Sequence, residues 1–173
     1  MESESVGLLL EPTEVLFSNV KFTRNGFLTA LDFPDSASKD NKNYTAEIAI
    51  SIQKTGGKVN FSECEFVDNT AKRTTAYLYL NKATNVTIER TRFENRLVKY
   101  SKDSAQGLQG GFLHVVADSK VYIRDSTFLK GYAEEGGALY TLGSTSIFLY
   151  NSRFEGNQAA NRQGGAISAI SFT

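Results

Sequence analysis

A short pattern repeats five times along this chain, and it constrains the fold more than any other feature of the sequence. Each copy centres on a phenylalanine, with Val or Ile seven residues before it and an apolar residue five before it. The anchor residues are Phe22, Phe66, Phe93, Phe128 and Phe154. In four copies a small side chain lies two residues before the anchor, and in three an asparagine lies three residues after it, at Asn25, Asn69 and Asn157. An internal repeat of this length is typical of a solenoid.

A second element follows each copy of the pattern. Its apolar side chains occur at every other position, which predicts a strand with one buried face. Counted back from the next copy's Val or Ile, the equivalent positions are Leu78, Leu113, Leu139 and, through a three-residue insertion, Ile48, with Ile167 closing the series. The later copies begin with a glycine pair. We expect Gly137 and Gly165 to allow a positive φ or a tight bend there.

These units predict a coil of stacked turns. No helical period persists for three turns, and two short strands cannot bury their apolar side chains without a neighbouring unit. Stacking places equivalent residues about 4.8 Å apart, and parallel crossovers are overwhelmingly right-handed. The sequence therefore predicts one all-β domain over residues 1–173, a right-handed parallel β-helix of about five to six turns. Its anchor phenylalanines should stack inside, and each following asparagine should lie at a corner, tolerate a left-handed conformation and bond to the next turn's backbone.

Two of the repeated motifs resemble those of a known family. They are Phe-x-x-Asn, at residues 66–69 and 154–157, and Gly-Gly-Ala-Ile/Leu, at residues 136–139 and 164–167. Together they resemble the repeats of polymorphic outer membrane proteins, which belong to the pectin-lyase-like class of β-helices. The resemblance covers about residues 15–170. It implies an extracellular or cell-surface location, a role in adhesion or scaffolding, and usually several further turns.

Charge and composition narrow the possible partners. The chain has 173 residues, with 19 Lys and Arg against 19 Asp and Glu, and such a balance disfavours a nucleic-acid binder. A basic cluster could hold an anion, although Glu89 and Glu94 dilute its charge; its members are Arg90, Arg92, Arg96, Lys99 and Lys102. The single cysteine, Cys64, excludes an internal disulfide and a multi-cysteine zinc site. We expect it to be a buried, inert thiol, and we expect no metal and no cofactor.

The two ends of the sequence carry separate expectations. The first residues are acidic, and the apolar run at residues 8–10 is too short for a signal core or a membrane span. We therefore expect no membrane insertion by this segment. Neither end shows a polar or helical cap, which solenoids need to avoid end-to-end pairing. This favours a piece of a longer chain, or a subunit whose ends are covered by partners.

Outward aromatic residues are the candidate binding residues. By strand alternation, Tyr79, His114 and Tyr140 should form an exposed ladder on consecutive turns, with Tyr77 and Phe112 on a neighbouring outward row. A second outward group on the preceding strands contains Tyr122, Phe148 and Tyr150. Exposed aromatic rows can stack on sugar rings or anchor a protein partner. They can equally be cross-strand pairs that stiffen a sheet.

Loops and glycosylation motifs offer further candidates. Two long excursions, at about residues 27–44 and 97–109, leave the coil at the same corner and are either functional loops or tolerated insertions. Three Asn-x-Ser/Thr motifs begin at Asn43, Asn60 and Asn85. These asparagines could be glycosylated in a secreting eukaryote.

Three functions remain open. Polysaccharide-cleaving β-helix enzymes need clustered carboxylates, and the outward rows offer no vertical pair of aspartates, so we expect no catalysis. The leading hypothesis is a scaffold or adhesin segment of a surface or extracellular protein that contacts protein or glycan. A carbohydrate-binding module using the Tyr79 ladder is the second, and a structural subunit of a large intracellular assembly is the third.

Overall fold

The computed structural model describes residues 8–10, 14–23, 50–53, 57–69, 77–96 and 108–170. Every regular element in these ranges is a β-strand, and no helix occurs among them. The first expected excursion, residues 27–44, lies outside the described residues, as do residues 97–107 of the second. Asn25, Asn43 and Ile48 also lie outside them.

Each turn of the coil contributes one strand to each of three sheets. The first sheet has the order β1 (Leu8–Leu10), β4 (Ile50–Gln53), β7 (Leu78–Asn81), β10 (Leu113–Val116), β14 (Leu139–Leu142) and β18 (Ile167–Ile170). The second has the order β15 (Ser146–Tyr150), β11 (Lys120–Arg124), β8 (Val86–Glu89), β5 (Lys58–Ser62) and β2 (Glu14–Ser18). The third has the order β16 (Arg153–Glu155), β12 (Thr127–Leu129), β9 (Arg92–Glu94), β6 (Glu65–Val67) and β3 (Lys21–Thr23). A small fourth sheet pairs β13 (Tyr132–Ala133) with β17 (Gln158–Ala159).

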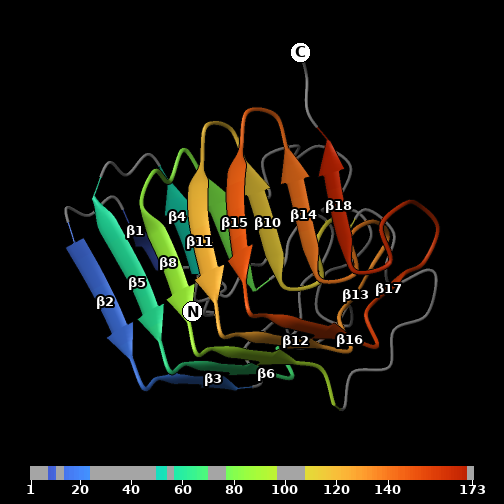
Figure 1. Cartoon of the computed structure of the whole chain (residues 1–173), viewed down its shortest axis with the longest axis horizontal. Coiled ribbons are helices and arrows are strands. Elements are labelled where there is room, and N and C mark those ends of the chain that lie inside the picture. Colours follow the sequence, from blue (N-terminus) through green and yellow to red (C-terminus); the bar gives the residue numbers. More distant parts are fainter. Residues whose placement is uncertain are drawn as a thin grey trace, which may run out of the picture.

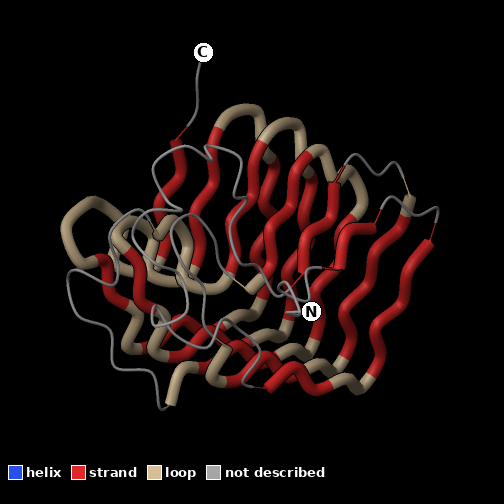
Figure 2. The backbone as a smooth tube through the Cα atoms, turned by 180° about the vertical axis from the view of Figure 1, so that it is seen from behind, coloured by secondary structure: helices blue, strands red, loops and turns tan. Residues whose placement is uncertain are grey.

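The strands wind as a right-handed parallel β-helix. The chain runs along the second sheet, turns into the third, and returns along the first on the opposite side (Figure 1). Figure 2 shows the same three sheets from behind, with loops only at the corners of the described turns. All pairings between these strands are parallel. The predicted fold class is confirmed.

The pairing register differs from the sequence prediction in one turn. Ile50 lies opposite Leu78, and Ile52 lies opposite Leu80. The expected match of Ile48 with Leu78 is therefore wrong by two residues. A shift of two residues keeps the same side chains facing inward, so the alternation of apolar residues could not reveal the error.

The anchor phenylalanines form a continuous stack inside the coil. Their ring centroids lie 4.5 Å apart for Phe22 and Phe66, and 4.8 Å apart for Phe66 and Phe93. The spacing continues at 4.8 Å from Phe93 to Phe128 and at 4.6 Å from Phe128 to Phe154. Neighbouring rings are inclined by at most 12°. The prediction of an internal stack with one ring per turn is confirmed.

The small residue before each anchor belongs to a ladder of hydrogen bonds. The backbone N–H of Cys64 donates to Thr91 Oγ1 over 3.3 Å, and that of Thr91 donates to Ser126 Oγ over 3.1 Å. The N–H of Ser126 continues the series to Ser152 Oγ over 3.3 Å. The residue before each of these four small residues has a positive φ; these residues are Glu63, Arg90, Asp125 and Asn151. The small side chains therefore do more than leave room for a ring, because their polar atoms satisfy the backbone at a sharp corner.

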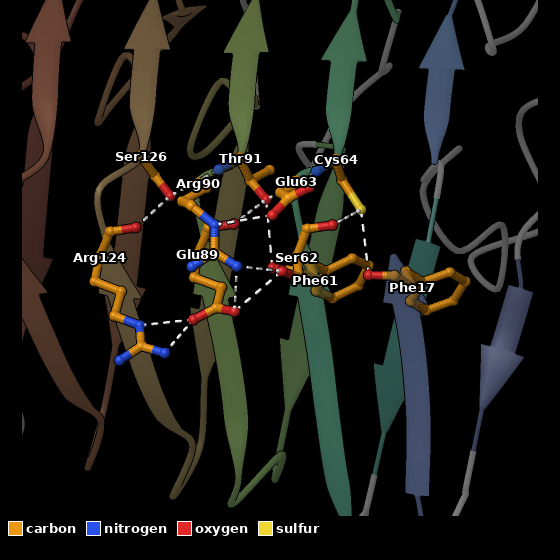
Figure 3. A network of polar contacts seen from close by, with 10 residues as sticks. All are labelled: Phe17, Phe61, Ser62, Glu63, Cys64, Glu89, Arg90, Thr91, Arg124 and Ser126. Carbon is orange, nitrogen blue, oxygen red and sulfur yellow. Dashed lines mark hydrogen bonds and ion pairs between the residues drawn. The ribbon is translucent and has the colours of Figure 1, made fainter. Parts of the chain in front are cut away.

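Cys64 fits this ladder as a buried thiol. Its Sγ donates to the carbonyl oxygens of Phe17 and Ser62, each over 3.4 Å (Figure 3). Burial raises the pKa of the Cys64 thiol above its ordinary value, against the opposing effect of backbone hydrogen bonds. The predicted inward placement is confirmed.

The corner asparagines bond to the neighbouring turn as expected. Asn69 Nδ2 donates to the carbonyl of Phe22 over 2.8 Å, and Asn157 Nδ2 donates to that of Phe128 over 2.9 Å. The left-handed conformation, however, falls on the residue before each asparagine, Asp68 at φ 53° and Gly156 at φ 62°. The expectation that the asparagines themselves take that conformation is wrong.

The two residues of each glycine pair have different structural roles. The first of each pair has the positive φ, as at Gly136 (60°) and Gly164 (72°), rather than Gly137 and Gly165 as expected. Gly137 is needed for another reason. A Cβ there would lie 2.3 Å from the carbonyl oxygen of Gly165 in the next turn, a distance that no side chain tolerates.

Replacing Phe93 by alanine tests the stack. Phe93 is fully buried between two parallel rings, so its removal should lower the free energy of unfolding by about 3–5 kcal/mol. Phe154→Ala is the matched control, and it should cost clearly less because Phe154 is only partly buried. Urea titrations followed by circular dichroism measure both values. Equal losses at the two positions would contradict the stack as the main source of stability.

Candidate functional site

The predicted ladder of Tyr79, His114 and Tyr140 exists, but most of it is buried. The three residues lie opposite one another on β7, β10 and β14. The His114 ring is perpendicular to both tyrosines, at 5.4 Å from Tyr79 and 4.9 Å from Tyr140. Along each strand these side chains alternate with the apolar side chains of the core, as expected. The expectation of exposure is wrong for His114, which is 5% exposed, and for Tyr140, which is 2% exposed, whereas Tyr79 is partly buried.

Tyr77 and Phe112 do not form an outward row, and this prediction is wrong. Both are fully buried, and their rings pack edge to face at 5.1 Å. The Tyr77 hydroxyl donates to the side-chain oxygen of Asn95, which is itself buried. Both residues immediately precede a strand and lie at the corner, where the two-residue alternation of a strand no longer applies.

Polar groups lie near Tyr140, at the buried end of the ladder. Burial and the neighbouring Glu135 carboxylate raise the pKa of Tyr140, and burial raises that of Tyr79. The Glu135 carboxylate is buried and accepts a hydrogen bond of 2.8 Å from Ser168 Oγ. Arg162 pairs with the adjacent Glu134 at 3.1 Å. The tyrosines therefore remain neutral over a wide pH range, and the ladder behaves as a set of cross-strand pairs that stiffen the first sheet.

The exposed aromatic face lies on the second sheet. Tyr122 and Phe148 stack at 4.8 Å with an interplanar angle of 14°, and Tyr150 on the same strand as Phe148 is 73% exposed. Lys120 Nζ lies 5.4 Å from the Tyr122 centroid and 5.6 Å from that of Phe148. An open depression over this face is lined by Thr87, Tyr122, Ile123, Arg124, Phe148 and Tyr150. We call Tyr122, Phe148, Tyr150 and Lys120 the aromatic face.

The aromatic face was only partly found from the sequence. Strand alternation correctly placed Tyr122, Phe148 and Tyr150 outward. It gave no weight to Lys120 or Arg124, although both occupy outward positions on β11, the strand that carries Tyr122. The alternation of Lys120 and Arg124 with the apolar Val121 and Ile123 was the sequence signal that could have identified them.

A charged network borders the aromatic face. Glu89 on β8 accepts hydrogen bonds from Arg124 Nε over 2.7 Å, and from Ser62 Oγ and Arg90 Nη2 over 3.0 Å each (Figure 3). Arg90 also pairs with Glu63 at 3.1 Å. The side chains come from three consecutive turns, because Ser62, Glu89 and Arg124 lie opposite one another in the sheet. The hydrogen bond from Arg124 lowers the pKa of the Glu89 carboxyl more than burial raises it.

The basic cluster expected from the sequence is largely neutralised by its neighbours. Arg92 pairs with Glu94 at 2.7 Å, and Arg96 lies 3.5 Å from both Asp68 and Glu94. Arg90 belongs to the Glu89 network described above. The remaining members, Lys99 and Lys102, lie outside the described residues. Arg90 and Arg96 therefore join adjacent turns through Glu63 and Asp68, whereas Arg92 pairs within its own strand.

The glycosylation motifs differ in their surroundings. Asn85 is exposed in the turn between β7 and β8, whereas Asn60 lies within β5 and is partly buried. Asn43 lies outside the described residues.

No protein-family model, curated protein or solved structure matches this chain. Within the described ranges, no three His, Cys, Asp or Glu side chains come together so as to hold a metal ion. The same part of the chain has no helix with the length and apolar character needed to cross a membrane.

The pH dependence of stability tests the Glu89 network. Because the pKa of Glu89 is lower in the folded protein than its ordinary value of 4.5, the unfolded chain takes up the proton first as the pH falls. The network's stabilisation is therefore present above about pH 4.5 and is lost as the pH falls further, through the folded pKa. Glu89→Gln should be less stable at pH 7 and should show a shallower loss of stability in acid.

Glu155→Gln is the matched control for that experiment, since Glu155 pairs with Arg153 on the exposed rim. Exposed pairs contribute little, so this variant should follow the parent protein at every pH. Thermal unfolding between pH 7 and pH 2.5 measures all three proteins. An acid profile unchanged by Glu89→Gln would contradict the assignment.

Proposed function

We propose that this chain is a non-catalytic β-helical scaffold of a surface or extracellular protein, and that it contacts a partner through the aromatic face. The observation that carries the proposal is the exposure of Phe148 and Tyr150 on a sheet held in strict register. A contiguous exposed aromatic group is costly to keep in water and marks interaction sites more often than isolated apolar residues do. The resemblance to polymorphic outer membrane protein repeats supports the surface location and the adhesive role.

The internal contacts favour a scaffold. The phenylalanine stack, the polar ladder beside it and the Glu89 network all join one turn to the next. A solenoid built in this way presents its outward side chains at fixed spacing, which suits a surface that must hold several contacts at once. The aromatic face uses this spacing, because Tyr122 and Phe148 occupy equivalent positions on β11 and β15.

A glycan is the second candidate partner, now at the aromatic face and not along the Tyr79 ladder. The burial of His114 and Tyr140 leaves little of that ladder to meet a sugar ring. The aromatic face combines exposed rings with the ammonium group of Lys120, and Arg124 lines the depression over this face. This combination suits a saccharide, with rings for its apolar side and cationic donors for hydroxyl or carboxylate oxygens.

Antibody labelling of source cells tests the location. An antibody raised against the 173-residue chain should label intact cells as strongly as permeabilised cells if the protein is exposed at the surface. Labelling that appears only after permeabilisation would overturn the proposal and favour the intracellular assembly subunit.

Substitutions on the aromatic face test the contact. The double variant Phe148→Ser, Tyr150→Ser should fold normally, because both side chains are exposed, and should bind at least tenfold more weakly to an array of neutral and acidic oligosaccharides. Leu16→Ser is the matched control, since Leu16 is an exposed apolar residue on β2 at the other end of the same sheet. Binding that survives the double variant, or that Leu16→Ser weakens equally, would contradict a glycan site at this face.

A further inference from the structure

One of the glycosylation motifs lies where a sugar can be attached to the folded coil. Asn85 is exposed in the turn that leads into β8, and its carbonyl oxygen accepts a hydrogen bond of 2.9 Å from the Val59 backbone N–H. The main chain is therefore fixed at the place where the side chain reaches solvent. Thr87, the hydroxyl residue of the motif, lies on the outward side of β8 and is partly exposed. The motif thus combines an accessible amide with an accessible hydroxyl.

The Asn60 motif lies in a different environment. Asn60 occupies the middle of β5, which is paired with β2 on one side and β8 on the other, and its Oδ1 atom is buried. The hydroxyl of Ser62, the third residue of this motif, donates to Glu89 over 3.0 Å and accepts from Arg90 over 3.0 Å (Figure 3). Both polar groups of the motif are therefore enclosed or engaged within the sheet. The structure favours Asn85 over Asn60 as an acceptor.

An aromatic ring lies close to Asn85. Thr87 is two residues along the chain from Asn85, and Tyr122 lies opposite Thr87 in the next turn. The spacing of residues along a strand and of strands in a sheet places the Cα atoms of Asn85 and Tyr122 roughly 8 Å apart. An asparagine side chain and one sugar ring together span such a distance.

One side of the Tyr122 ring is available for a sugar. Among the described residues Tyr122 stacks with one ring, that of Phe148 in the following turn, at 4.8 Å and 14°. The opposite side of the Tyr122 ring therefore faces the preceding turn, where the register places Thr87. The short Thr87 side chain does not fill the place of a ring, and both residues line the open depression on this sheet. The apolar side of a sugar ring stacks well on an aromatic ring.

We propose that Asn85 carries an N-linked glycan and that the first sugar of this glycan packs against the side of Tyr122 that faces Thr87. The inference rests on the proposed extracellular location, because N-linked sugars belong to the surfaces of secreted proteins. The glycan would border the aromatic face on the side of β8. Phe148 and Tyr150 lie one turn further along the coil and remain free to contact a partner.

The attachment needs no catalytic group of this chain. A transferase moves an oligosaccharide from a lipid pyrophosphate donor to the amide. The bond between Asn85 Nδ2 and C1 of the first sugar forms, the bond from C1 to the pyrophosphate oxygen breaks, and the lipid pyrophosphate leaves. One proton of the amide passes to a base of the transferase. This chain supplies the Asn85 amide and the Thr87 hydroxyl of the recognised motif.

Mass spectrometry of the protein from source cells tests the attachment. Trypsin should release residues 83–90, which contain Asn85, and residues 59–72, which contain Asn60. After treatment with a peptide N-glycosidase in heavy-oxygen water, the Asn85 amide should be converted to a heavy-oxygen carboxyl group, whereas the Asn60 amide should stay unchanged. An Asn85 peptide that carries no glycan would overturn the proposal.

Antibody labelling of the same cells separates this result from a failure of the proposed function. Surface labelling together with an unmodified Asn85 would overturn the glycan and leave the surface location standing. A glycan on Asn85 in protein that labels only after permeabilisation would support the glycan and overturn the surface location.

Thr87 offers a matched pair of variants. In chains secreted from a eukaryotic host with Asn43→Gln as the background, Thr87→Ser should keep the glycan and Thr87→Ala should lose it, although both retain Asn85. The loss of mass on treatment with the N-glycosidase measures the glycan. Asn60→Gln is the control and should carry as much glycan as the parent. A glycan that persists in Thr87→Ala would overturn the assignment to Asn85.

Thermal unfolding tests the contact with Tyr122. Enzymatic removal of the glycan should lower the melting temperature by about 2–4 °C, the shift that the loss of one aromatic contact gives in a protein of this size. In Tyr122→Ser the same treatment should change the melting temperature little, and this variant also controls for the carboxylate that the enzyme leaves at Asn85. Phe148→Ser should keep the full shift. An equal shift in Tyr122→Ser would overturn the packing against Tyr122.

Discussion

The structure depends on the in-register stacking of like side chains between parallel turns. Once one turn lies on the next, each inward column must be filled at a spacing close to 4.8 Å, and only similar shapes can repeat at that distance without gaps. Flat phenylalanine rings meet this constraint with centroids 4.5–4.8 Å apart. The same constraint explains Gly137, where the neighbouring backbone comes too close for any side chain.

Stacking also determines what the surface can do. The register that aligns the core aligns the outward rows, so Glu89 meets Arg124 in one row, and Tyr122 meets Phe148 in another. Several charged groups near these rows are paired with a neighbouring turn, as Arg90 is with Glu63. The aromatic face differs from these paired rows because its apolar side chains remain in contact with solvent.

The repeated pattern made the fold predictable from the sequence, whereas the side chains at the corners between strands did not follow it. Five copies of one pattern were enough to derive the coil, the phenylalanine stack and the bonds of Asn69 and Asn157. Two of the errors arose where strands begin. Tyr77 and Phe112 turn inward at a corner, outside the alternation, and Ile48 was misplaced because alternation does not change under a shift of two residues. The burial of His114 depends on contacts beyond its own strand, which no local pattern reports.

The most direct test of the stacked coil is a nuclear Overhauser experiment on protein with selectively labelled phenylalanine rings. Phe66 and Phe93 lie 4.8 Å apart, as do Phe93 and Phe128, so each of these pairs should give ring-to-ring cross-peaks. Phe66 and Phe128 lie two turns apart, with the Phe93 ring between them, and should give none. Cross-peaks between Phe66 and Phe128, or none between consecutive anchors, would contradict a coil in which each turn stacks on the one before it.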